Sequence, residues 1–280
     1  MKKDIVLSKR MEAVVNMVSL QSLVVPKKIH VADIGCDHAY VSIALVERKI
    51  ADKVIAMDVR EGPLKIAAKN IAEYGAQDAI ELRLSDGMEK LALGEADTII
   101  IAGMGGLLMC SILKQGLNRL FGDGLFHKEQ QMMADGKQRP VLILQPQSDL
   151  FKVRIFLLEY GYCMEQEKML VDEGKYYTVI RAVPEELLDR KEKESVKARK
   201  PYNEVELLYG RYGLRNRDMV LYDFLQKEAV VLENIYQKLE KTVEKAHKEG
   251  REVPEKTIER LESVKKEREQ NGKAAGYFMR

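Results

Sequence analysis

The sequence predicts an α/β protein in which a doubly wound parallel sheet is followed by an α-helical coiled-coil hairpin. Short apolar runs alternate with stretches of helical pattern over roughly the first two thirds of the 280 residues. This alternation is typical of βαβ units with right-handed crossovers. Apolar residues at heptad spacing follow in the last third. We therefore expect two domains, residues 1–184 and residues 185–280.

The first predicted element is a helix over Leu7–Leu23, in which apolar residues recur at helical spacing and Ser8 is available as an N-cap. Five strands follow, in the runs HVADIG, KVIAMDV, IELRLSD, ADTIIIAG and PVLILQP. Two further strands, Tyr162–Glu167 and Lys175–Val183, are expected to close the sheet as a pair. The long connection from Gly116 to Arg139 resembles an insertion near the strand ends.

The second domain is expected to begin with a charged connecting helix, Glu185–Lys200. A heptad seam is then predicted from Leu225, Ala229, Leu232, Tyr236, Leu239, Val243 and Ala246. Pro254 marks the start of a second helix, so an antiparallel hairpin is the economical interpretation. Its seam can be closed within the chain or by a second subunit, which leaves self-association open. The tail from Asn271 is expected to fray.

Composition favours a globular protein of a reducing compartment. Apolar residues make up 46% of the chain and the net charge is +2, so composition by itself does not indicate nucleic-acid binding. A local excess of basic residues, Lys9 and Arg10 among them, lies near the start. The three cysteines form no CxxC pair, and no segment has the roughly 20 apolar residues that a membrane span needs. We expect a cytoplasmic protein without membrane contact.

The end of the first predicted strand, ADIGCDHAY, is the first candidate ligand site. In doubly wound sheets, ligands lie beyond the carboxyl ends of the strands, where a small residue allows close approach. Gly35 is this small residue, and Asp33 just before it is placed to orient an α-amino group. Asp37 is a candidate cap of the following helix. His38 and Tyr40 are expected near the rim of the site.

An acidic residue, Asp58, ends the second predicted strand, and a carboxylate there can accept both hydrogen bonds of a ribose diol. This feature indicates a nucleoside ligand without deciding the reaction. A dinucleotide site requires GxGxxG in the first turn, where Cys36, Asp37 and His38 stand instead. A carboxylate at that helix start repels a pyrophosphate but not the cationic sulfonium and ammonium groups of S-adenosyl-L-methionine. The sequence therefore favours S-adenosyl-L-methionine as the cofactor.

The remaining strand ends complete the candidate site. Asp86 after the third strand can accept a hydrogen bond from the adenine 6-amino group. The run from Ala102 to Gly106 ends the fourth strand, and its glycines keep side chains away from a transferred methyl group. Gln145 lies on the far lip, at the end of the fifth strand. Single glycines and acids are common in turns, but their occurrence at four strand ends in order favours a site. No metal is expected, because Asp37 and His38 have no third ligand at suitable spacing.

ADIGCDHAY, SDG, AGMGG and LQP, followed by a helical hairpin, closely resemble the bacterial tRNA (adenine-22-N1)-methyltransferase family, TrmK, over nearly the whole chain. The resemblance implies a Rossmann-like class I methyltransferase domain that uses S-adenosyl-L-methionine. It also implies a coiled-coil domain involved in tRNA recognition and an adenine of the tRNA D arm as the substrate.

The resemblance further implies roles for individual residues. The methionine side of the cofactor pocket would be lined by Asp33, Gly35, Cys36, Asp37 and His38, the ribose by Asp58 and Val59, the adenine by Asp86 and Gly87, and the methyl group by Ala102, Gly103, Met104 and Gly105. Cys36 departs from the serine expected there and loses one good hydrogen bond. The Gly116–Arg139 connection is a second departure.

The predicted nucleophile, adenine N1, has a free lone pair and needs no general base. In-line placement of N1, the methyl carbon and sulfur is expected to supply most of the acceleration. The product adenine is cationic, so a nearby carboxylate or carbonyl is expected to stabilise it. The candidate catalytic residues are Asp37, His38 and Tyr40, with Gln145 positioning the base edge.

Other functions stay open at this point. A methyltransferase acting on a different RNA, a protein or a small molecule would share every cofactor residue. An NAD-dependent enzyme is disfavoured by the missing glycine signature, and a non-catalytic adaptor would lack cofactor binding. The basic residues of the hairpin discriminate among these functions, because RNA is favoured if they gather on one face toward the cleft. These residues are Lys227, Lys238, Lys241, Lys245, Arg260, Lys265 and Lys266.

Overall fold

The computed structural model describes residues 5–19, 29–122, 138–188, 191–192, 194 and 200–279. They belong to two compact units, Met1–Pro201 and Tyr202–Arg280, and each unit is described by itself. Half of the predicted connecting helix Glu185–Lys200 lies outside the described residues. Its start forms a 3-10 turn, Glu185–Leu187, and the described residues Lys191, Glu192 and Glu194 are helical. The predicted domain boundary after residue 184 stays a prediction.

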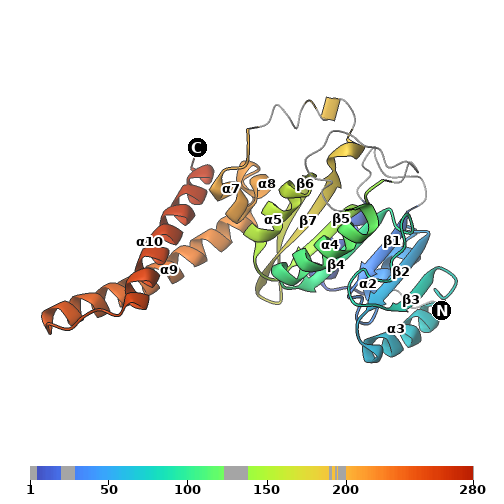
Figure 1. Ribbon diagram of the computed structural model, residues 1–280, viewed down its shortest axis with the longest axis horizontal. Coiled ribbons are helices and arrows are strands. Elements are labelled where there is room, and N and C mark those ends of the chain that lie inside the picture. Colours follow the sequence, from blue (N-terminus) through green and yellow to red (C-terminus); the bar gives the residue numbers. More distant parts are fainter. Residues whose placement is uncertain are drawn as a thin grey trace. The chain divides into compact units, whose positions relative to one another are not determined.

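The first unit is built on a seven-stranded sheet with the order β3-β2-β1-β4-β5-β7-β6 (Figure 1). Its strands are β1 (His30–Ile34), β2 (Lys53–Asp58), β3 (Ile80–Leu84), β4 (Thr98–Met104), β5 (Val141–Pro146), β6 (Tyr162–Asp172) and β7 (Lys175–Pro184). Neighbours among β1–β5 pair in parallel, whereas β7 runs antiparallel to both β5 and β6. The predicted doubly wound sheet with its closing pair is confirmed.

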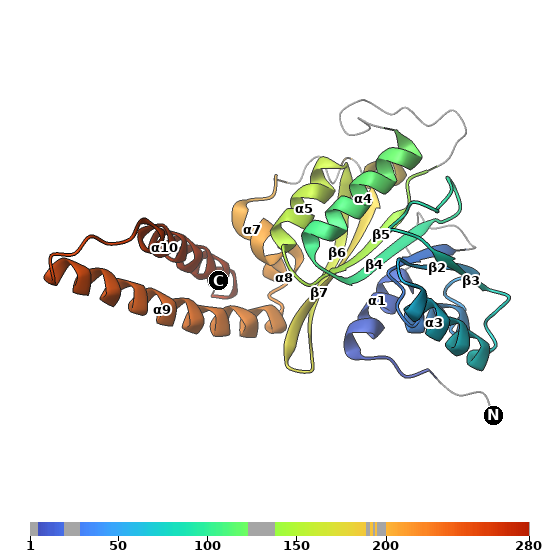
Figure 2. The ribbon, with the colours of Figure 1, turned by 60° about the horizontal axis from the view of Figure 1, so that its bottom comes forward.

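Helices cover both faces of this sheet (Figure 2). On one face, α1 (Lys9–Ser19), α2 (Tyr40–Glu47) and α3 (Glu61–Tyr74) share a core with the sheet. On the other face, α4 (Gly106–Phe121) and α5 (Leu150–Glu159) lie side by side. The strand order reverses between β1 and β4, and at such a switch point the carboxyl ends of the strands form a crevice for ligands.

Element ends refine two predictions in the first unit. Ser8 is the cap of α1 as predicted, because its Oγ accepts a hydrogen bond from the main-chain N–H of Met11 at 3.3 Å. Residues 20–28, which include the end of the predicted Leu7–Leu23 helix, are not described. Helix α4 continues to Phe121, so the predicted connection from Gly116 begins later than expected. Residues 123–137 of that connection also lie outside the described part.

The second unit consists of α7 (Glu204–Tyr209), α8 (Arg211–Arg215), α9 (Met219–Lys248), α10 (Glu255–Ala275) and a 3-10 turn, Gly276–Phe278. Helices α9 and α10 pack against each other as the predicted hairpin (Figure 2). Leu225, Leu232 and Ala246 of the predicted seam are buried, as is Val264 of α10. The seam is therefore closed at these positions within the chain.

The prediction of a frayed tail is wrong. Asn271 lies inside α10, where its Nδ2 donates to the main-chain oxygen of Leu225 at 3.0 Å and to Glu228 Oε2 at 2.9 Å. Ala274 is fully buried one turn later. These long-range contacts, which a sequence pattern does not reveal, hold the last helical turns.

Among the described helices, none combines the length and apolar character needed to cross a bilayer.

Candidate active site

The chain turns sharply after β1 at Gly35. Its φ of +74° lies in the left-handed region that glycine adopts without steric cost. The main-chain N–H groups of Gly35 and Cys36 both donate to the oxygen of Met57, at 2.8 and 2.9 Å. A Cβ added at Gly35 would overlap the Cε of Met104. The end of the Met104 side chain on β4 therefore lies against this turn after β1, and another residue at position 35 would have a strained main-chain conformation.

Asp33 is a buried carboxyl group at the end of β1. It is 4% exposed, and Ser42 of α2 donates a hydrogen bond to its Oδ2 at 2.6 Å. The pKa of Asp33 is raised from 3.8 to about 6, chiefly by burial and to a smaller extent by the charge of Asp58, while the Ser42 hydrogen bond lowers it. A cationic ligand would stabilise the charged form of this carboxyl. The predicted α-ammonium contact at Asp33 matches this requirement.

Asp58 joins the loops that follow β1 and β2. Its Oδ2 accepts from the main-chain N–H of Asp37 at 3.3 Å, and its Oδ1 accepts from that of Arg60 at 2.9 Å. The carboxylate is 5% exposed. Its main-chain oxygen accepts from the N–H of Ser85 at 2.9 Å, which draws the end of β3 toward the same edge. Val59, the next residue, is 60% exposed beside it.

Asp37, His38 and Tyr40 form the outer part of the first turn. Asp37 and Ala39 have φ angles of +50° and +60°, which are uncommon for residues other than glycine and mark a strained turn. The prediction that Asp37 caps the next helix is wrong, because Ala39 is the N-cap of α2 and no side chain caps the helix. The Asp37 Oδ1 instead lies 3.6 Å from His38 Nε2, and the His38 ring packs edge-on against Tyr40.

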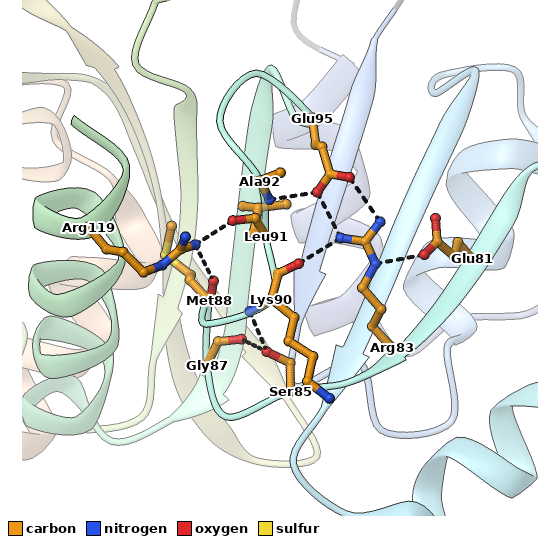
Figure 3. A network of polar contacts seen from close by, with 10 residues as sticks. All are labelled: Glu81, Arg83, Ser85, Gly87, Met88, Lys90, Leu91, Ala92, Glu95 and Arg119. Carbon is orange, nitrogen blue, oxygen red and sulfur yellow. Dashed lines mark hydrogen bonds and ion pairs between the residues drawn. The ribbon is translucent and has the colours of Figure 1, made fainter.

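Two arginines hold the loop after β3 that carries Asp86 and Gly87 (Figure 3). Arg83 of β3 donates to Glu95 Oε2 at 2.7 Å and to a main-chain oxygen of the loop at 2.7 Å. Arg119 of α4 donates to two further main-chain oxygens of the loop. The three oxygens belong to Lys90, Met88 and Leu91. The side chain of Asp86 stays exposed, and the loop that presents it is fixed from both sides.

The AGMGG run at the end of β4 contains glycines with different roles. Gly103 has a φ of +79°, and the pairing of β4 with β5 shifts register between Ala102 and Met104. Such a bulge redirects the strand end and is common beside active sites. Gly105 is the N-cap of α4. A Cβ on Gly106 would overlap the main-chain oxygen of Ser148, so this glycine permits close packing of α4 on the loop after β5.

Arg10, for which the sequence analysis indicated no role, reaches the same edge from α1. Its Nη1 lies 3.5 Å from the position that a Cβ on Gly103 would take and 3.5 Å from Gln145 Oε1. Gln145 is fully buried, and its Nε2 donates to the main-chain oxygen of Pro146 at 3.1 Å. The local basic excess near the start was the one sequence signal that included Arg10. The predicted contact between Gln145 and the substrate base stays a prediction.

The assembled edge suits S-adenosyl-L-methionine. Buried carboxylates at Asp33 and Asp58 and an exposed one at Asp86 can accept hydrogen bonds from an ammonium group, a ribose diol and an adenine amine. Gly35 and Gly103 add no side chains of their own at these turns, where the side chains of Met104 and Arg10 lie beside them. Within the described ranges, no cluster of three or more His, Cys, Asp or Glu side chains is arranged to hold a metal ion.

The sheet is doubly wound, and β7 is inserted antiparallel between β5 and β6. Acidic and glycine-rich strand ends lie at its switch point. This combination defines a class I methyltransferase domain. Residues 7–180 match the family described as "Methyltransferase domain". The chain belongs to this family.

Comparison with individual proteins points to one branch of methyltransferases. The chain is 34% identical to the tRNA (adenine(22)-N(1))-methyltransferase of Bacillus subtilis over 179 residues, which are 64% of this chain and 66% of that protein. The crystal structure of the B. subtilis TrmK superposes with a TM-score of 0.74 at 26% identity, covering 97% of this chain and all of that one. A crystal structure of Streptococcus pneumoniae Sp1610 in complex with S-adenosyl-L-methionine has a TM-score of 0.69 at 25% identity and covers 96% of this chain. The predicted resemblance to TrmK is confirmed.

Proposed function

We propose that this protein transfers the methyl group of S-adenosyl-L-methionine to N1 of adenine 22 in the D arm of tRNA. The observation that carries the proposal is the likeness to B. subtilis TrmK over 97% of the chain, both units included. The ends of β1–β4 supply the acidic and glycine residues that this cofactor requires. A methyltransferase with a different RNA, protein or small-molecule substrate is the alternative.

In this proposal, the cofactor is held by groups whose chemistry is complementary to its parts. Asp33 accepts from the α-ammonium group and Asp58 from the ribose diol. A carboxylate offers about four lone-pair positions, so Asp58 can bind the diol while it keeps its two main-chain partners. Asp86 accepts from the adenine amine, and Gly35 and Gly103 allow the ligand to approach the main chain.

The bound cofactor supplies an electrophilic methyl group on a sulfonium. The adenine N1 lone pair forms the new N–C bond while the electrons of the S–C bond return to sulfur, which leaves S-adenosylhomocysteine. No proton has to be removed before attack, so the work of the chain is to hold N1 in line and exclude other nucleophiles. Asp37 at the rim is the carboxylate proposed to stabilise the cationic product, with His38, Tyr40 and Gln145 positioning the base.

The second unit is proposed to bind tRNA. Lys238, Lys241, Lys245 and Lys248 are exposed on α9, and their spacing of three, four and three residues places them on one face of the helix. This row is a candidate contact for the phosphate backbone. Self-association through the hairpin is a separate proposal, for which Val230 and Val231 are exposed apolar side chains on α9. A cytoplasmic location is part of the proposal, since tRNA is the substrate.

The test is methyl transfer from labelled S-adenosyl-L-methionine to an unmethylated tRNA transcript, followed by nucleoside mass spectrometry. We expect 1-methyladenosine, and no label in a matched transcript with guanosine at position 22. Tight cofactor binding without label in either transcript would contradict the substrate assignment and favour the alternative methyltransferase.

A further inference from the structure

Arg10 is held at the ends of β4 and β5 by contacts from remote parts of the chain. Its main-chain N–H donates to Asp172 Oδ2 at 3.1 Å, and its guanidinium lies over the ring of Tyr177, 5.3 Å from the ring centre. Its Nη1 reaches Gln145 Oε1 at 3.5 Å. The Gln145 amide and the Tyr177 ring orient the guanidinium. The Asp172 carboxylate, which accepts from the main-chain N–H of Arg10, also interacts with its positive charge. The Nη1 end of the guanidinium is directed at the neutral amide of Gln145 and remains able to interact with an anionic ligand.

The guanidinium lies on the same face of the sheet as Asp33. Asp33 is bonded to Ser42 of α2, and α1 and α2 share the core on that face. Asp33 is in register with Ile100 of β4, and Ala102, two residues further along β4, is in register with Gln145. Side chains two residues apart on a strand share a face, and neighbouring strands lie about 4.8 Å apart. Asp33 and Arg10 therefore flank the end of β4 from two sides.

The charges of S-adenosyl-L-methionine require an acidic and a basic partner near the end of β4. Its α-ammonium and α-carboxylate are attached to the same carbon atom, so a cation for the carboxylate must lie close to the acid that binds the ammonium. Of the nearby arginines, Arg60 faces Asp58 and Arg83 is paired with Glu81 and Glu95. The carboxylate would otherwise meet an edge dominated by Asp33, Asp37 and Asp58.

We infer that Arg10 binds the α-carboxylate of S-adenosyl-L-methionine. The inference rests on the cofactor of the proposed function, not on its RNA substrate. A tRNA phosphate is the competing anion for this guanidinium. The cofactor is favoured because Arg10 is half-buried beside Gly103 on the face of Asp33, whereas Asp37 at the rim is exposed.

The test pairs a change in the protein with a change in the ligand. Calorimetry measures the affinity of the wild-type protein and of Arg10→Gln for S-adenosyl-L-methionine and for its decarboxylated analogue, which lacks only the carboxylate. We expect the wild type to bind the complete cofactor about 10- to 100-fold more tightly than the analogue, as for a charge-assisted hydrogen bond. Arg10→Gln should lose this preference, and Arg10→Lys should keep part of it.

Arg48→Gln is the matched control. Arg48 also lies on the α1–α2 side, but it pairs with Glu12 at the far end of α2 from Tyr40. Its variant should keep the full preference for the complete cofactor. Thermal unfolding of each variant checks that the fold is intact, and the comparison of the two ligands on the wild type requires no substitution at all.

Three outcomes would overturn the inference. In the first, the wild type binds both ligands with the same affinity. In the second, Arg10→Gln weakens the binding of both ligands by the same factor, which indicates a structural role. In the third, Arg10→Gln keeps the preference for the complete cofactor and loses affinity for tRNA, which indicates a phosphate contact. Failure of the RNA assignment is distinguishable, because a wild type that discriminates between the ligands but does not label tRNA supports the role of Arg10 alone.

Discussion

At the scale of single residues, the carboxylates of the site fall into a buried group and an exposed group. Asp33 and Asp58 are buried and are held by a hydroxyl or by main-chain N–H groups, whereas Asp37 and Asp86 are exposed. A buried carboxylate costs folding free energy unless it is well paired. This cost is expected for residues kept for a ligand, and it leads to two predictions.

Asp33→Asn is expected to stabilise the cofactor-free protein at neutral pH. Because the pKa of Asp33 is raised to about 6 in the folded state, the native protein binds more protons than the unfolded chain between about pH 4 and 6, and its stability falls as pH rises through this range. Above pH 6 the charged Asp33 lowers the free energy of unfolding by about 3 kcal/mol. Urea unfolding should show the variant more stable at pH 8 and equal to the wild type near pH 4, with weaker cofactor binding. Equal stability at pH 8 would contradict the buried, destabilised carboxylate.

Asp58→Ala is expected to weaken binding of S-adenosyl-L-methionine by about 1–3 kcal/mol, because it removes the acceptor of the ribose hydrogen bonds and the link between two loops. Calorimetry measures the change. Glu61→Ala, which alters an exposed carboxylate at the start of α3, is the matched control and should bind normally. Unchanged affinity of a folded Asp58→Ala variant would move Asp58 out of the site.

At the scale of secondary-structure elements, close packing at the start of α4 depends on a single glycine, Gly106. Gly106→Ala would drive a Cβ into the main-chain oxygen of Ser148, and we expect a loss of about 1–3 kcal/mol in the free energy of unfolding. Gly62→Ala is the control, because a Cβ at this position in α3 meets nothing within 4 Å and should stabilise slightly. Denaturant unfolding of both variants tests the contrast, and a neutral Gly106→Ala would show that α4 can shift.

The loop after β3 is expected to depend on Arg119. Arg119→Met removes the two hydrogen bonds to the main-chain oxygens of Met88 and Leu91, at about 1 kcal/mol each. We expect faster amide hydrogen exchange in the loop and roughly 3- to 30-fold weaker cofactor binding, while Arg119→Lys keeps part of both. Unaltered exchange rates would mean that Arg83 alone holds the loop.

At the scale of the whole molecule, the second unit is expected to determine the affinity for tRNA. Replacing Lys238, Lys241 and Lys245 by Gln should weaken tRNA binding and leave cofactor affinity unchanged. Each lost phosphate contact lowers the slope of log affinity against log salt by about 0.7–0.9. Filter binding at several salt concentrations measures this slope.

The control for this lysine row is the triple replacement of Lys227, Lys266 and Lys273 by Gln. Each of these lysines already pairs with a carboxylate in the second unit, so its loss should affect tRNA binding less. Equal effects of the two triple variants would show that the net charge of the unit, rather than the row on α9, attracts tRNA.

The sequence by itself determined the order of the elements, the α/β class, the hairpin and the positions of the acidic and glycine-rich strand ends. Each of these depends on residues close together in the chain: strand runs and heptads are short periodic patterns, and Gly35 or Gly103 marks a local turn. The resemblance to TrmK rested on the same local motifs, and the matched family and whole-chain fold agree with it.

Only the tertiary structure decided what these residues contact. Arg10 meets Gln145 and Asp172 across 135 and 162 positions of the chain, the pKa of Asp33 rises because other elements bury it, and Asn271 orders a tail that local composition predicted to fray. Asp37 fails to cap α2 because Ala39 takes the N-cap position and Asp58 holds the turn. Burial and electrostatics depend on neighbours brought together by folding, and a pattern along the chain does not contain that information.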